Sequence, residues 1–516
     1  MIPATAAHAL RQRHTVANAA SGGGVGSAPV APTFPRSDSA CALSETSDQD
    51  QQLPRAKTAL LTTSPHRKPA HHPAPPRDRS FRTRYSKLDM DRLMAERDEF
   101  RGFYVMFWVS IAFYAAWTVL SNLQSRGILF SLDLWHGMTR GIGRAILTDL
   151  KMVSTLFGSM VLTYLHAWRL ISPTTGAWLQ ISYETAFVLG WVSSIYRSNY
   201  YWTQTSFLVL HTLSNFFKIH SYNSTIRKLA AAEIRRRHLL RTLISADLSS
   251  STSSDSAPVD PATEAANYAE LDHLEAVLCP HGTLRYPAHV SLTNFADYLI
   301  CPTVVYELEY PRTECIRWRY VAVKAATGIA AVSVMFLTVE SHVLPIVSKP
   351  QGLAQFPGAV LHLFLPFIAM FLMTFIVLFE SACNGLAELS CFADRHFYDD
   401  WYNSSTFEQF ARKWNRPVHE FLHRHVYLEL HKEFAVPKPK AQFLTFLFSS
   451  VLHEAAIFVI TRKFRMYFFV MQMFQLVLIW AARHPLIRRH PVAGNAFFWF
   501  GMFLMIPTLT AGYCWY

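Results

Sequence analysis

The sequence has few charged residues, no glycine-rich nucleotide motif and no cysteine pair with metal-site spacing. Charged residues make up 16% of the 516 residues, against about 25% in average globular proteins. Neither GxGxxG nor GxxxxGK[ST] occurs, so nothing points to a bound nucleotide cofactor. The seven cysteines contain no CxxC pair, and an odd number fits no closed disulfide framework. We interpret them as mostly free thiols, and we expect neither a metal site nor a cofactor.

The composition divides the chain into two unlike parts. Residues 1–95 are polar and rich in Pro, Ser and Arg, whereas most of the remainder is apolar and aromatic. We predict a disordered, basic, cytosolic tail over residues 1–95; its acid-poor start is also compatible with a transit peptide, but it lacks the apolar core of a secretory signal. Its basic residues are not interleaved with aromatics, so we expect contacts with membrane lipids rather than nucleic acid.

Nine apolar stretches within residues 96–516 are predicted to span a membrane, which takes about 20 helical residues. The third and fourth stretches are weaker, because they contain Glu184 and His211. The chain is therefore predicted to be an all-α polytopic membrane protein. The nine predicted spans are residues 102–123, 152–170, 176–196, 203–217, 320–338, 360–379, 441–460, 466–482 and 496–516.

An odd number of spans places the two ends of this domain on opposite sides of the membrane. With a cytosolic tail, most basic loops are cytosolic as well, as the positive-inside rule requires. Residues 226–241 are predicted to form a basic helix at or projecting from that face, and residues 249–287 a flexible loop. The basic turn at Arg462, Lys463 and Arg465 disagrees; either it is buried in protein or one span is miscounted.

The segment between the sixth and seventh spans, residues 391–440, combines positive charge with aromatic residues. A capping box formed by Ser405 and Glu408 predicts the start of one helix, and Pro417 suits the first turn of a second. Two amphipathic helices here could anchor the segment at the membrane surface. They could also form the mouth of a site for an anionic, amphipathic ligand, but anchoring is the simpler interpretation and is preferred from these residues alone.

An ionisable pair, His453 and Glu454, lies inside the apolar stretch 441–460. Charge at such a depth is costly, so this pair is a functional-site hypothesis. Ser449 and Ser450 precede His453 on the same helical face. A neutral imidazole could take a proton from a hydroxyl or could hydrogen-bond between helices. Glu454 points about 100° away around the helix and is expected to pair with another helix, for example through Lys or Arg. Three further histidines are interpreted as structural or channel-lining: His166, His211 and His362.

Three motifs together resemble those of membrane-bound O-acyltransferases of the sterol and diacylglycerol branch. FYDDWYN at residues 397–403 is similar to the family motif FYxDWWN, SSVLHE around His453 to its intramembrane histidine motif, and CPTVVYELEYPRT at residues 301–313 to its pre-span block. The resemblance runs from about residue 100 to the end of the sequence. Within that branch, the sequence looks most similar to fungal sterol O-acyltransferases. Tyr402 departs from the pattern, since the family has Trp there.

This resemblance implies the fold of that family and an endoplasmic-reticulum enzyme, commonly a homodimer or homotetramer. Such an enzyme transfers a fatty acyl group from acyl-CoA to the 3β-hydroxyl of a sterol, here expected to be ergosterol. The catalytic histidine maps to His453 and an asparagine near the reaction centre to Asn415, whose alternative role is a helix N-cap. The acyl-CoA motif maps to Phe397, Tyr398, Asp400, Trp401, Tyr402 and Asn403. The cations considered for the CoA phosphates are Arg395, Arg412, Lys413 and Arg416.

Two alternatives remain open from the sequence. A diacylglycerol acyltransferase on the same scaffold shares the His-Glu and FYxDW features, and sequence separates it only by similarity. A non-enzymatic lipid or sterol transporter could use His453 as a proton site. The FYDDWYN segment argues against that transporter.

Overall fold

The structure, a computed structural model, describes residues 81–89, 92–93, 101–252, 261–279, 285–349, 352–482, 484 and 490–516. Regular structure in this part of the chain is helical, and its only β-contacts are two isolated bridges, Arg84–Asp394 and Arg312–Phe392. The prediction of an all-α protein is confirmed. Most of the predicted tail, residues 1–80, lies outside the described residues.

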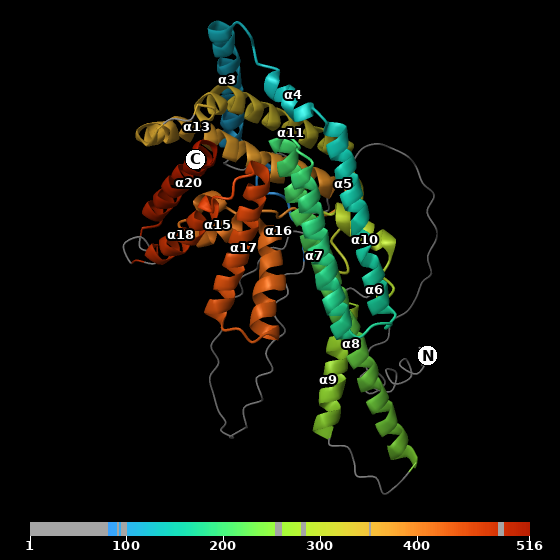
Figure 1. The fold of residues 1–516 in the computed structure, drawn as a ribbon. Helices are drawn as coiled ribbons and strands as arrows, with labels where there is room; N and C mark the ends of the chain where they lie inside the picture. The colour runs from blue at the N-terminus through green and yellow to red at the C-terminus, as the bar shows by residue number, and fades with distance from the viewer. Residues whose placement is uncertain are drawn as a thin grey trace, which may run out of the picture. The chain divides into compact units, whose positions relative to one another are not determined.

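The helices follow one another with short connections, and several meet end to end (Figure 1). The first half of the chain contains α3 (Arg101–Arg126), α4 (Asp133–Thr139), α5 (Ile142–Leu156), α6 (Ser159–Ala167), α7 (Pro173–Arg197), α8 (Trp202–Thr252), α9 (Pro261–Leu278) and α10 (Leu292–Ile300). The middle contains α11 (Trp318–Thr338), η1 (Val339–Val343), α12 (Leu344–Val347), η2 (Leu353–Gln355), α13 (Phe356–Phe375), η3 (Ile376–Cys383) and α14 (Asn384–Leu389). The remainder contains η4 (Trp401–Asn403), α15 (Phe407–Lys413), α16 (Arg416–Phe421), η5 (Leu422–Tyr427), η6 (Glu429–Glu433), α17 (Lys438–Thr461), α18 (Tyr467–Ala481) and α20 (Pro491–Trp515).

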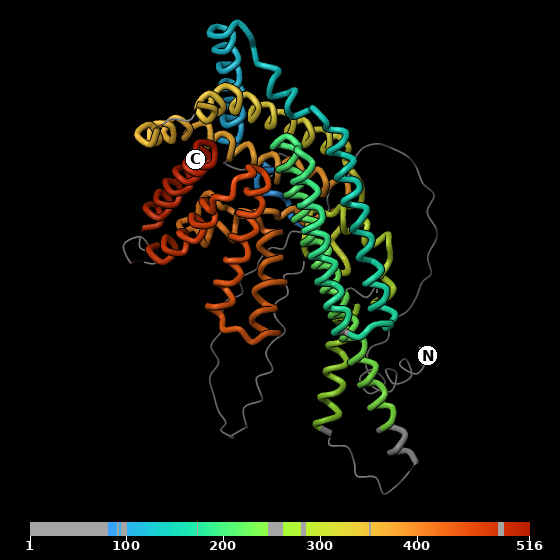
Figure 2. The backbone as a smooth tube through the Cα atoms, viewed as in Figure 1, coloured from blue at the N-terminus to red at the C-terminus, as the bar shows by residue number. Residues whose placement is uncertain are grey.

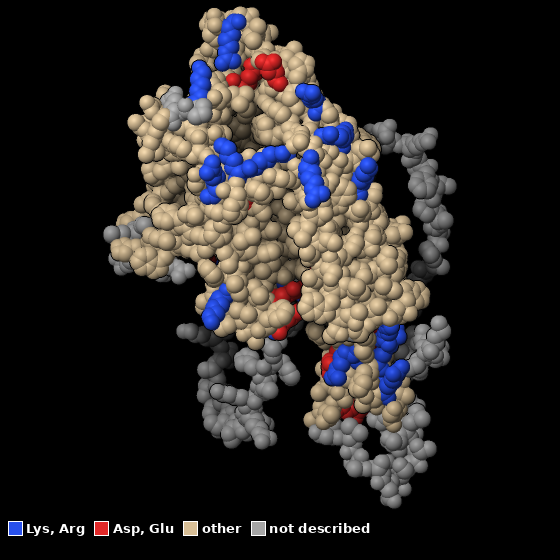
Figure 3. Space-filling view, viewed as in Figure 1, with Lys and Arg blue, Asp and Glu red and all other residues tan. Residues whose placement is uncertain are grey.

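Six helical stretches are long and apolar enough to cross a membrane, and they coincide with six of the nine predicted spans. On the face drawn in Figure 3, Lys, Arg, Asp and Glu gather at two levels, separated by a broad band without them. Such a distribution is expected of a chain that crosses a bilayer. The six stretches are Arg101–Arg126, Asp133–Ala167, Trp318–Val347, Leu353–Leu389, Lys438–Thr461 and Pro491–Trp515.

The three other predicted spans also form helices, but of a different kind. Residues 176–196 lie in α7 and residues 203–217 in α8, and both helices carry more polar side chains. Helix α7, for example, buries Gln180 and Glu184, which are hydrogen-bonded to each other. Residues 466–482 form the shorter apolar helix α18, whose 15 residues rise only about 22 Å.

Helix α8 continues for 51 residues, through the fourth predicted span and the basic stretch beyond it. Its basic part lies beside α9 (Figure 2), where Nε of Arg235 is 2.7 Å from Oε1 of Glu270. The expectation of a flexible loop over residues 249–287 is therefore wrong for Pro261–Leu278. The acidic residues of this segment form a helix against the basic residues of α8, since opposite charges favour that pairing.

Residues 81–89, which the sequence assigns to the tail, are packed against the helices. Ser86 and Asp89 are each 1% exposed. Nη2 of Arg84 is 2.5 Å from Oδ2 of Asp394, and the hydroxyl of Tyr320 in α11 donates to Asp89. The predicted boundary at residue 95 is wrong for this segment, because its buried polar groups find their partners inside the helical domain.

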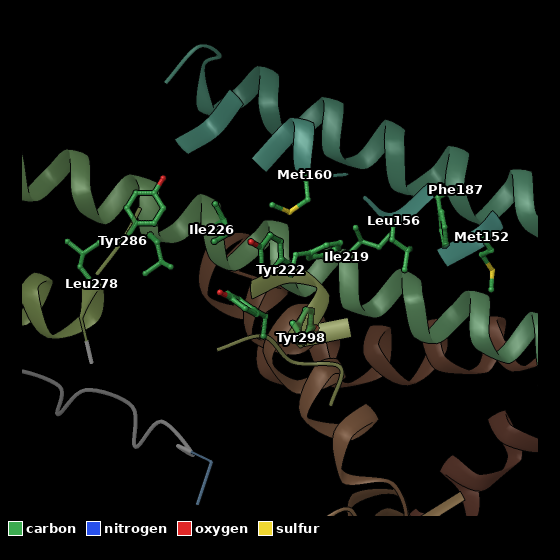
Figure 4. Packing of buried hydrophobic residues seen from close by; sticks show 13 residues of the cluster. Met152, Leu156, Met160, Phe187, Ile219, Tyr222, Ile226, Leu278, Tyr286 and Tyr298 are labelled. Carbon is green, nitrogen blue, oxygen red and sulfur yellow. The ribbon is translucent and has the colours of Figure 1, made fainter. Parts of the chain in front are cut away.

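The largest buried cluster joins α5 to α10 and is drawn in Figure 4. Tyr222 of α8 contacts Tyr298 of α10 within it, at a ring-centroid distance of 6.2 Å. A smaller cluster extends this scaffold toward α17, since Phe217 of α8 stacks on Phe421 of α16 at 4.3 Å and Leu452 of α17 packs against them. The position of α17 therefore depends on α8.

Candidate active site

His453 lies in α17, and its side chain is exposed. Its Nδ1 is 2.8 Å from the backbone carbonyl oxygen of Ser449, one turn earlier. Because a carbonyl oxygen can only accept, Nδ1 carries the proton, and a neutral imidazole then has its lone pair on Nε2. The ring also stacks on Phe468 at a centroid distance of 5.4 Å. The imidazole is thus held in one orientation with Nε2 as a proton acceptor.

The two serines before His453 have different partners. The hydroxyl of Ser450 is buried and donates to the carbonyl oxygen of Phe446 at 2.9 Å. Ser449 contacts His453 through its carbonyl oxygen. The support that the sequence suggested for His453 therefore comes from the backbone of one serine.

Glu454 points away from His453 and is 3% exposed. Its carboxylate accepts hydrogen bonds from the backbone N–H groups of Met466 (2.9 Å) and Phe469 (3.1 Å), and from the hydroxyl of Tyr513 (2.9 Å). The unpaired N–H groups at the start of α18 attract a carboxylate. Glu454 therefore pairs with two other helices, through N–H and O–H donors rather than through the Lys or Arg suggested above.

The basic turn at residues 462–465 is held against the ends of two helices. Arg462 donates to the carbonyl oxygen of Tyr196 at 2.7 Å, and Nζ of Lys463 to that of Tyr513 at 2.7 Å. Arg465, the third cation of the turn, donates to the main-chain oxygen of Tyr516. Carbonyl groups at a helix C-terminus carry partial negative charge. These cations are therefore paired with protein carbonyl oxygens, but Arg462 and Arg465 are exposed. The turn is thus not buried in protein, and a miscounted span stays open as the other explanation.

The aromatic residues of the FYDDWYN segment form part of the core. Phe397, Tyr398 and Trp401 are 2%, 1% and 3% exposed. Trp401 meets Trp414 edge to face at a centroid distance of 4.9 Å, and such pairs add about 0.5–1.5 kcal/mol beyond area burial. Its other aromatic neighbours are Phe371, Phe375, Phe410 and Trp499. These side chains support the segment from behind.

The last two residues of the segment lie nearer the surface. Tyr402 is partly exposed, and its carbonyl oxygen accepts from Nδ2 of Asn495 at 2.9 Å and from Nε1 of Trp499 at 3.2 Å. Its ring lies 5.8 Å from that of Trp401. Asn403 is exposed. The tyrosine at position 402 thus keeps an aromatic face against the core.

A buried polar cluster behind Tyr398 was not predicted. The hydroxyl of Tyr398 donates to Glu380 and accepts from the N–H of Leu88 at 3.0 Å. Oε2 of Glu380 is 3.2 Å from Nζ of Lys324. Burial and the charge of Glu380 raise the pKa of Tyr398 well above its usual value, so the phenol stays a donor. A signal existed, because Lys324 and Glu380 are opposite charges in or next to predicted spans, and such charges pair.

The two aspartates of the segment hold the cations that follow it. Oδ1 of Asp399 is 2.7 Å from Nε2 of His396, and its Oδ2 is 2.6 Å from Nη1 of Arg416. The hydrogen bond from His396, together with Arg416, holds the pKa of Asp399 well below its usual range. Oδ1 of Asp400 is 3.1 Å from Nζ of Lys413. Burial opposes ionisation of Asp400, but Lys413 lowers its pKa.

The two helices predicted after the segment are α15 and α16, and the second continues through η5 and η6. The N-cap of α15 is Thr406, whose side chain accepts from the N–H of Gln409 at 3.1 Å. The prediction of a capping box formed by Ser405 and Glu408 is therefore wrong in its residues, although the helix begins within one residue of the position expected. The backbone N–H of Ser405, the residue before this N-cap, donates to Oε1 of Gln409 at 2.9 Å, so the return bond goes one residue further back than in a standard capping box.

Asn415 lies in the connection between α15 and α16, against the FYDDWYN segment. The N–H of Asp399 donates to the carbonyl oxygen of Lys413 at 2.8 Å, and the N–H of Arg416 donates to the carbonyl oxygen of Phe397 at 3.0 Å. Oδ1 of Asn415 accepts from the N–H of Val418 at 3.2 Å, so this residue is the N-cap of α16. Its Nδ2 group is then the part that can donate to a ligand.

The four cations considered for the CoA phosphates differ in accessibility. The side chain of Arg395 is 3% exposed and paired with Glu388. It is therefore not placed to meet a soluble ligand. Those of Lys413 and Arg416 are 27% and 18% exposed. Arg412 is 55% exposed and 3.5 Å from a carboxylate of its own helix.

A pocket opens beside the start of the FYDDWYN segment. It lies between Phe81 and Arg84, residues 302–305 and the start of α16, and its lining includes His396, Arg416 and Arg424. The lining also includes Asp394 and Glu420, and Arg416 and Arg424 are each within 3.3 Å of a carboxylate. The pocket therefore has a mixed, charge-paired wall.

The fold and the site residues define a class of protein: an α-helical membrane protein with an exposed histidine on an apolar helix and a separate buried aromatic segment whose aspartates orient cations. The model of the membrane-bound O-acyltransferase family matches residues 103–515. The chain belongs to this family and is an acyltransferase. The transporter alternative loses its support.

The most similar relatives include fungal proteins. The chain is 30% identical to sterol O-acyltransferase 2 of Candida albicans, over 80% of this chain and 74% of that protein. It is 31% identical to probable sterol O-acyltransferase 2 of Schizosaccharomyces pombe, over 80% of this chain and 87% of that protein. A shorter match, 35% identical, covers 41% of this chain and 42% of diacylglycerol O-acyltransferase 1 of Arabidopsis thaliana. The chain spans between 64% and 87% of the length of the sterol O-acyltransferase relatives.

Proposed function

We propose that this protein is an acyl-CoA:sterol O-acyltransferase, which makes steryl esters for storage, with ergosterol as the acceptor. The names of its fungal relatives support this substrate class. The single observation that carries the mechanism is the hydrogen bond from Nδ1 of His453 to the carbonyl oxygen of Ser449. This bond leaves Nε2 as the base that a weakly nucleophilic hydroxyl requires.

In the proposed mechanism, Nε2 of His453 accepts the proton of the sterol hydroxyl as the oxygen attacks the thioester carbonyl carbon. The new C–O bond forms, the C–S bond breaks, and the imidazolium returns the proton to the departing CoA thiolate. General-base catalysis of this kind contributes about 10²–10⁴-fold. No acyl-enzyme, metal or cofactor is required for these steps, and acyl-CoA is a co-substrate.

Asn415 is proposed to stabilise the oxyanion that develops on the thioester carbonyl. Its Oδ1 is held by the N–H of Val418, so Nδ2 is directed as the donor. A preorganised donor costs no reorganisation during the reaction, and the loss of one lowers kcat by about 10²–10³-fold. Capping and catalysis are therefore compatible roles for this residue.

The FYDDWYN segment is proposed to form the acyl-CoA site. Its buried aromatic residues give a rigid base, and its aspartates orient Lys413 and Arg416. Of the four cations, Arg412 and Lys413 have the most exposed side chains and are proposed to contact the CoA phosphates. The acyl chain and the sterol would arrive through the bilayer, which also limits hydrolysis of the thioester. An endoplasmic-reticulum location, a cytosolic N-terminal tail and a homodimer or homotetramer remain proposals from the family resemblance.

The second candidate is diacylglycerol O-acyltransferase activity at the same site. The match to the plant diacylglycerol O-acyltransferase favours it, since identity there is 35%. The chemistry would be the same, because the acceptor is again a hydroxyl. The shorter extent of that match is the reason for ranking it second.

The two functions are separated by supplying purified full-length protein, in lipid nanodiscs, with labelled oleoyl-CoA and either ergosterol or diacylglycerol. Steryl ester is the expected product, and the same protein with His453→Asn is the control for background acylation. Triacylglycerol as the main product would select the second candidate. Failure of a folded preparation to form either ester would contradict both.

A further inference from the structure

A group of ionisable side chains outside the sequence motifs gathers where α8 meets η5 and η6. His220, His425 and Glu429 each offer one ligand atom, and these atoms all lie within 4.8 Å of one another. Their side chains are 22%, 5% and 13% exposed. The acyl transfer proposed above uses none of the three.

We propose that His220, His425 and Glu429 bind a divalent transition-metal ion of the zinc class. Two imidazoles and one carboxylate are a ligand set that zinc commonly uses. With bonds of about 2.0–2.1 Å, a tetrahedral site separates its ligand atoms by about 3.3 Å. The most widely separated ligand atoms would therefore close in by up to about 1.5 Å on binding.

The second nitrogen of each imidazole already has a polar partner, and that of His220 has the carboxylate that is typical of metal-bound histidines. Nδ1 of His220 is 2.9 Å from Oε2 of Glu184 in α7, and Nε2 of His425 is 2.9 Å from Oγ of Ser221. Nε2 of His220 and Nδ1 of His425 are then the atoms left for an ion. Nδ1 of His425 is buried without a hydrogen-bond partner among the described residues, because Glu429 is 3.7 Å away.

The charges around this group fit a dication. Glu184 and Glu429 supply two carboxylates against one nearby ammonium, that of Lys228, whose Nζ is 3.0 Å from Oε1 of Glu429. Lys228 is 49% exposed and also lies 3.3 Å from Glu433. It therefore has another carboxylate to pair with when a metal ion occupies Glu429.

A metal ion here would be structural. It would join α7 and α8 to the helix η5–η6 that precedes α17, and so would fix the scaffold of His453. The sequence did not predict this group, because His220 is far from the other two ligands in the chain. Only the spacing of four between His425 and Glu429 was visible, and it is too common to indicate a metal.

The test uses untagged full-length protein in detergent, stripped with a chelator and dialysed against buffered Zn²⁺. Bound zinc is measured by plasma mass spectrometry, and Co²⁺ bound in its place by visible absorption. About one equivalent of zinc is expected for the wild-type protein. His425→Gln and Glu429→Gln should lower the affinity more than tenfold, and Glu184→Gln, which acts through His220, by about 10–100-fold.

The matched control is His431→Gln. His431 lies in η6 with Glu429, but its Nδ1 is bonded to the carbonyl oxygen of Val436 at 2.9 Å, so zinc binding should be unchanged. Zinc that persists in His425→Gln would be adventitious and would overturn the proposal. Wild-type protein that binds neither Zn²⁺ nor Co²⁺ would also overturn it, whether or not the variants fold. Because bound metal is the readout, that failure would leave the proposed acyl transfer untouched.

Discussion

The hydroxyl of Tyr513 donates a hydrogen bond to the carboxylate of Glu454 at 2.9 Å. Tyr513 belongs to α20, and Glu454 also accepts from two N–H groups at the start of α18. One carboxylate therefore ties α17, α18 and α20 together. The proposed base, His453, is the preceding residue of α17, so its position depends on this junction.

The first prediction concerns Glu454→Gln. The amide keeps the size of the side chain but places an NH₂ donor among three donors, so one buried hydrogen bond is lost. We expect a loss of stability of about 1–3 kcal/mol and a lower kcat, because α17 is no longer fixed against α18. Thermal unfolding in detergent and initial acylation rates measure the two effects. Tyr513→Phe, which removes one donor only, should cost about 0.5–1.5 kcal/mol; equal stability of Glu454→Gln and wild type would contradict this role.

The second prediction concerns His453→Asn. Asparagine cannot take the proton of the acceptor hydroxyl, so kcat should fall by about 10²–10⁴-fold. Thermal stability should change little, because the hydrogen bond of His453 is to its own helix. His362→Asn in α13 is the control, since that histidine is also exposed on an apolar helix and should keep near-normal activity. An active His453→Asn enzyme would exclude the general-base role.

Features that depend on local sequence were predicted from it. Hydropathy over a window identified the helices that are long and apolar enough to cross a membrane, and a turn motif placed α15 within one residue. The positions of these elements follow from residues close together in the chain. For the same reason, the sequence indicated that Asn415 could cap a helix.

Features that depend on three-dimensional packing, often with partners far apart in the chain, were missed. Residues 81–89 looked like tail because their partners, such as Asp394 and Glu380, lie about 300 residues away. The segment Pro261–Leu278 looked like a loop because its basic partner helix comes earlier in the chain. Arg395 looked available for a phosphate, although its carboxylate partner is only seven residues before it. Nothing in the local pattern shows that this arginine is buried.

The third prediction concerns pH. The hydrogen bond from His396 and the charge of Arg416 depress the pKa of Asp399 in the folded state. A carboxyl group of this kind stabilises the fold above its unfolded pKa of about 3.9, and that contribution is lost as the pH falls toward the folded value. The thermal unfolding temperature of the wild-type protein should therefore fall on acidification below about pH 5. Asp399→Asn should start lower at neutral pH and fall less steeply; parallel curves for the two proteins would show that Asp399 is not responsible.

The fourth prediction separates the cations that hold the fold from those that meet acyl-CoA. Arg395→Ala leaves Glu388 buried with one fewer partner, although Arg317 still lies 3.0 Å from it. Breaking a buried pair costs about 3–5 kcal/mol, and the remaining arginine should keep the loss near the lower end. We expect a lower unfolding temperature without a selective change in the KM for acyl-CoA.

Lys413→Ala should behave in the opposite way. Its ammonium is partly exposed beside Asp400, and a charge-assisted hydrogen bond is worth about 1.5–3 kcal/mol, so its loss should raise the KM for oleoyl-CoA by roughly tenfold or more. Oleoyl-pantetheine, which lacks the nucleotide phosphates, serves as the comparison substrate. The ratio of wild-type to variant activity should return toward unity with it, because the lost contact is to a phosphate. An equal defect with both substrates would mean that Lys413 acts by holding Asp400 in place.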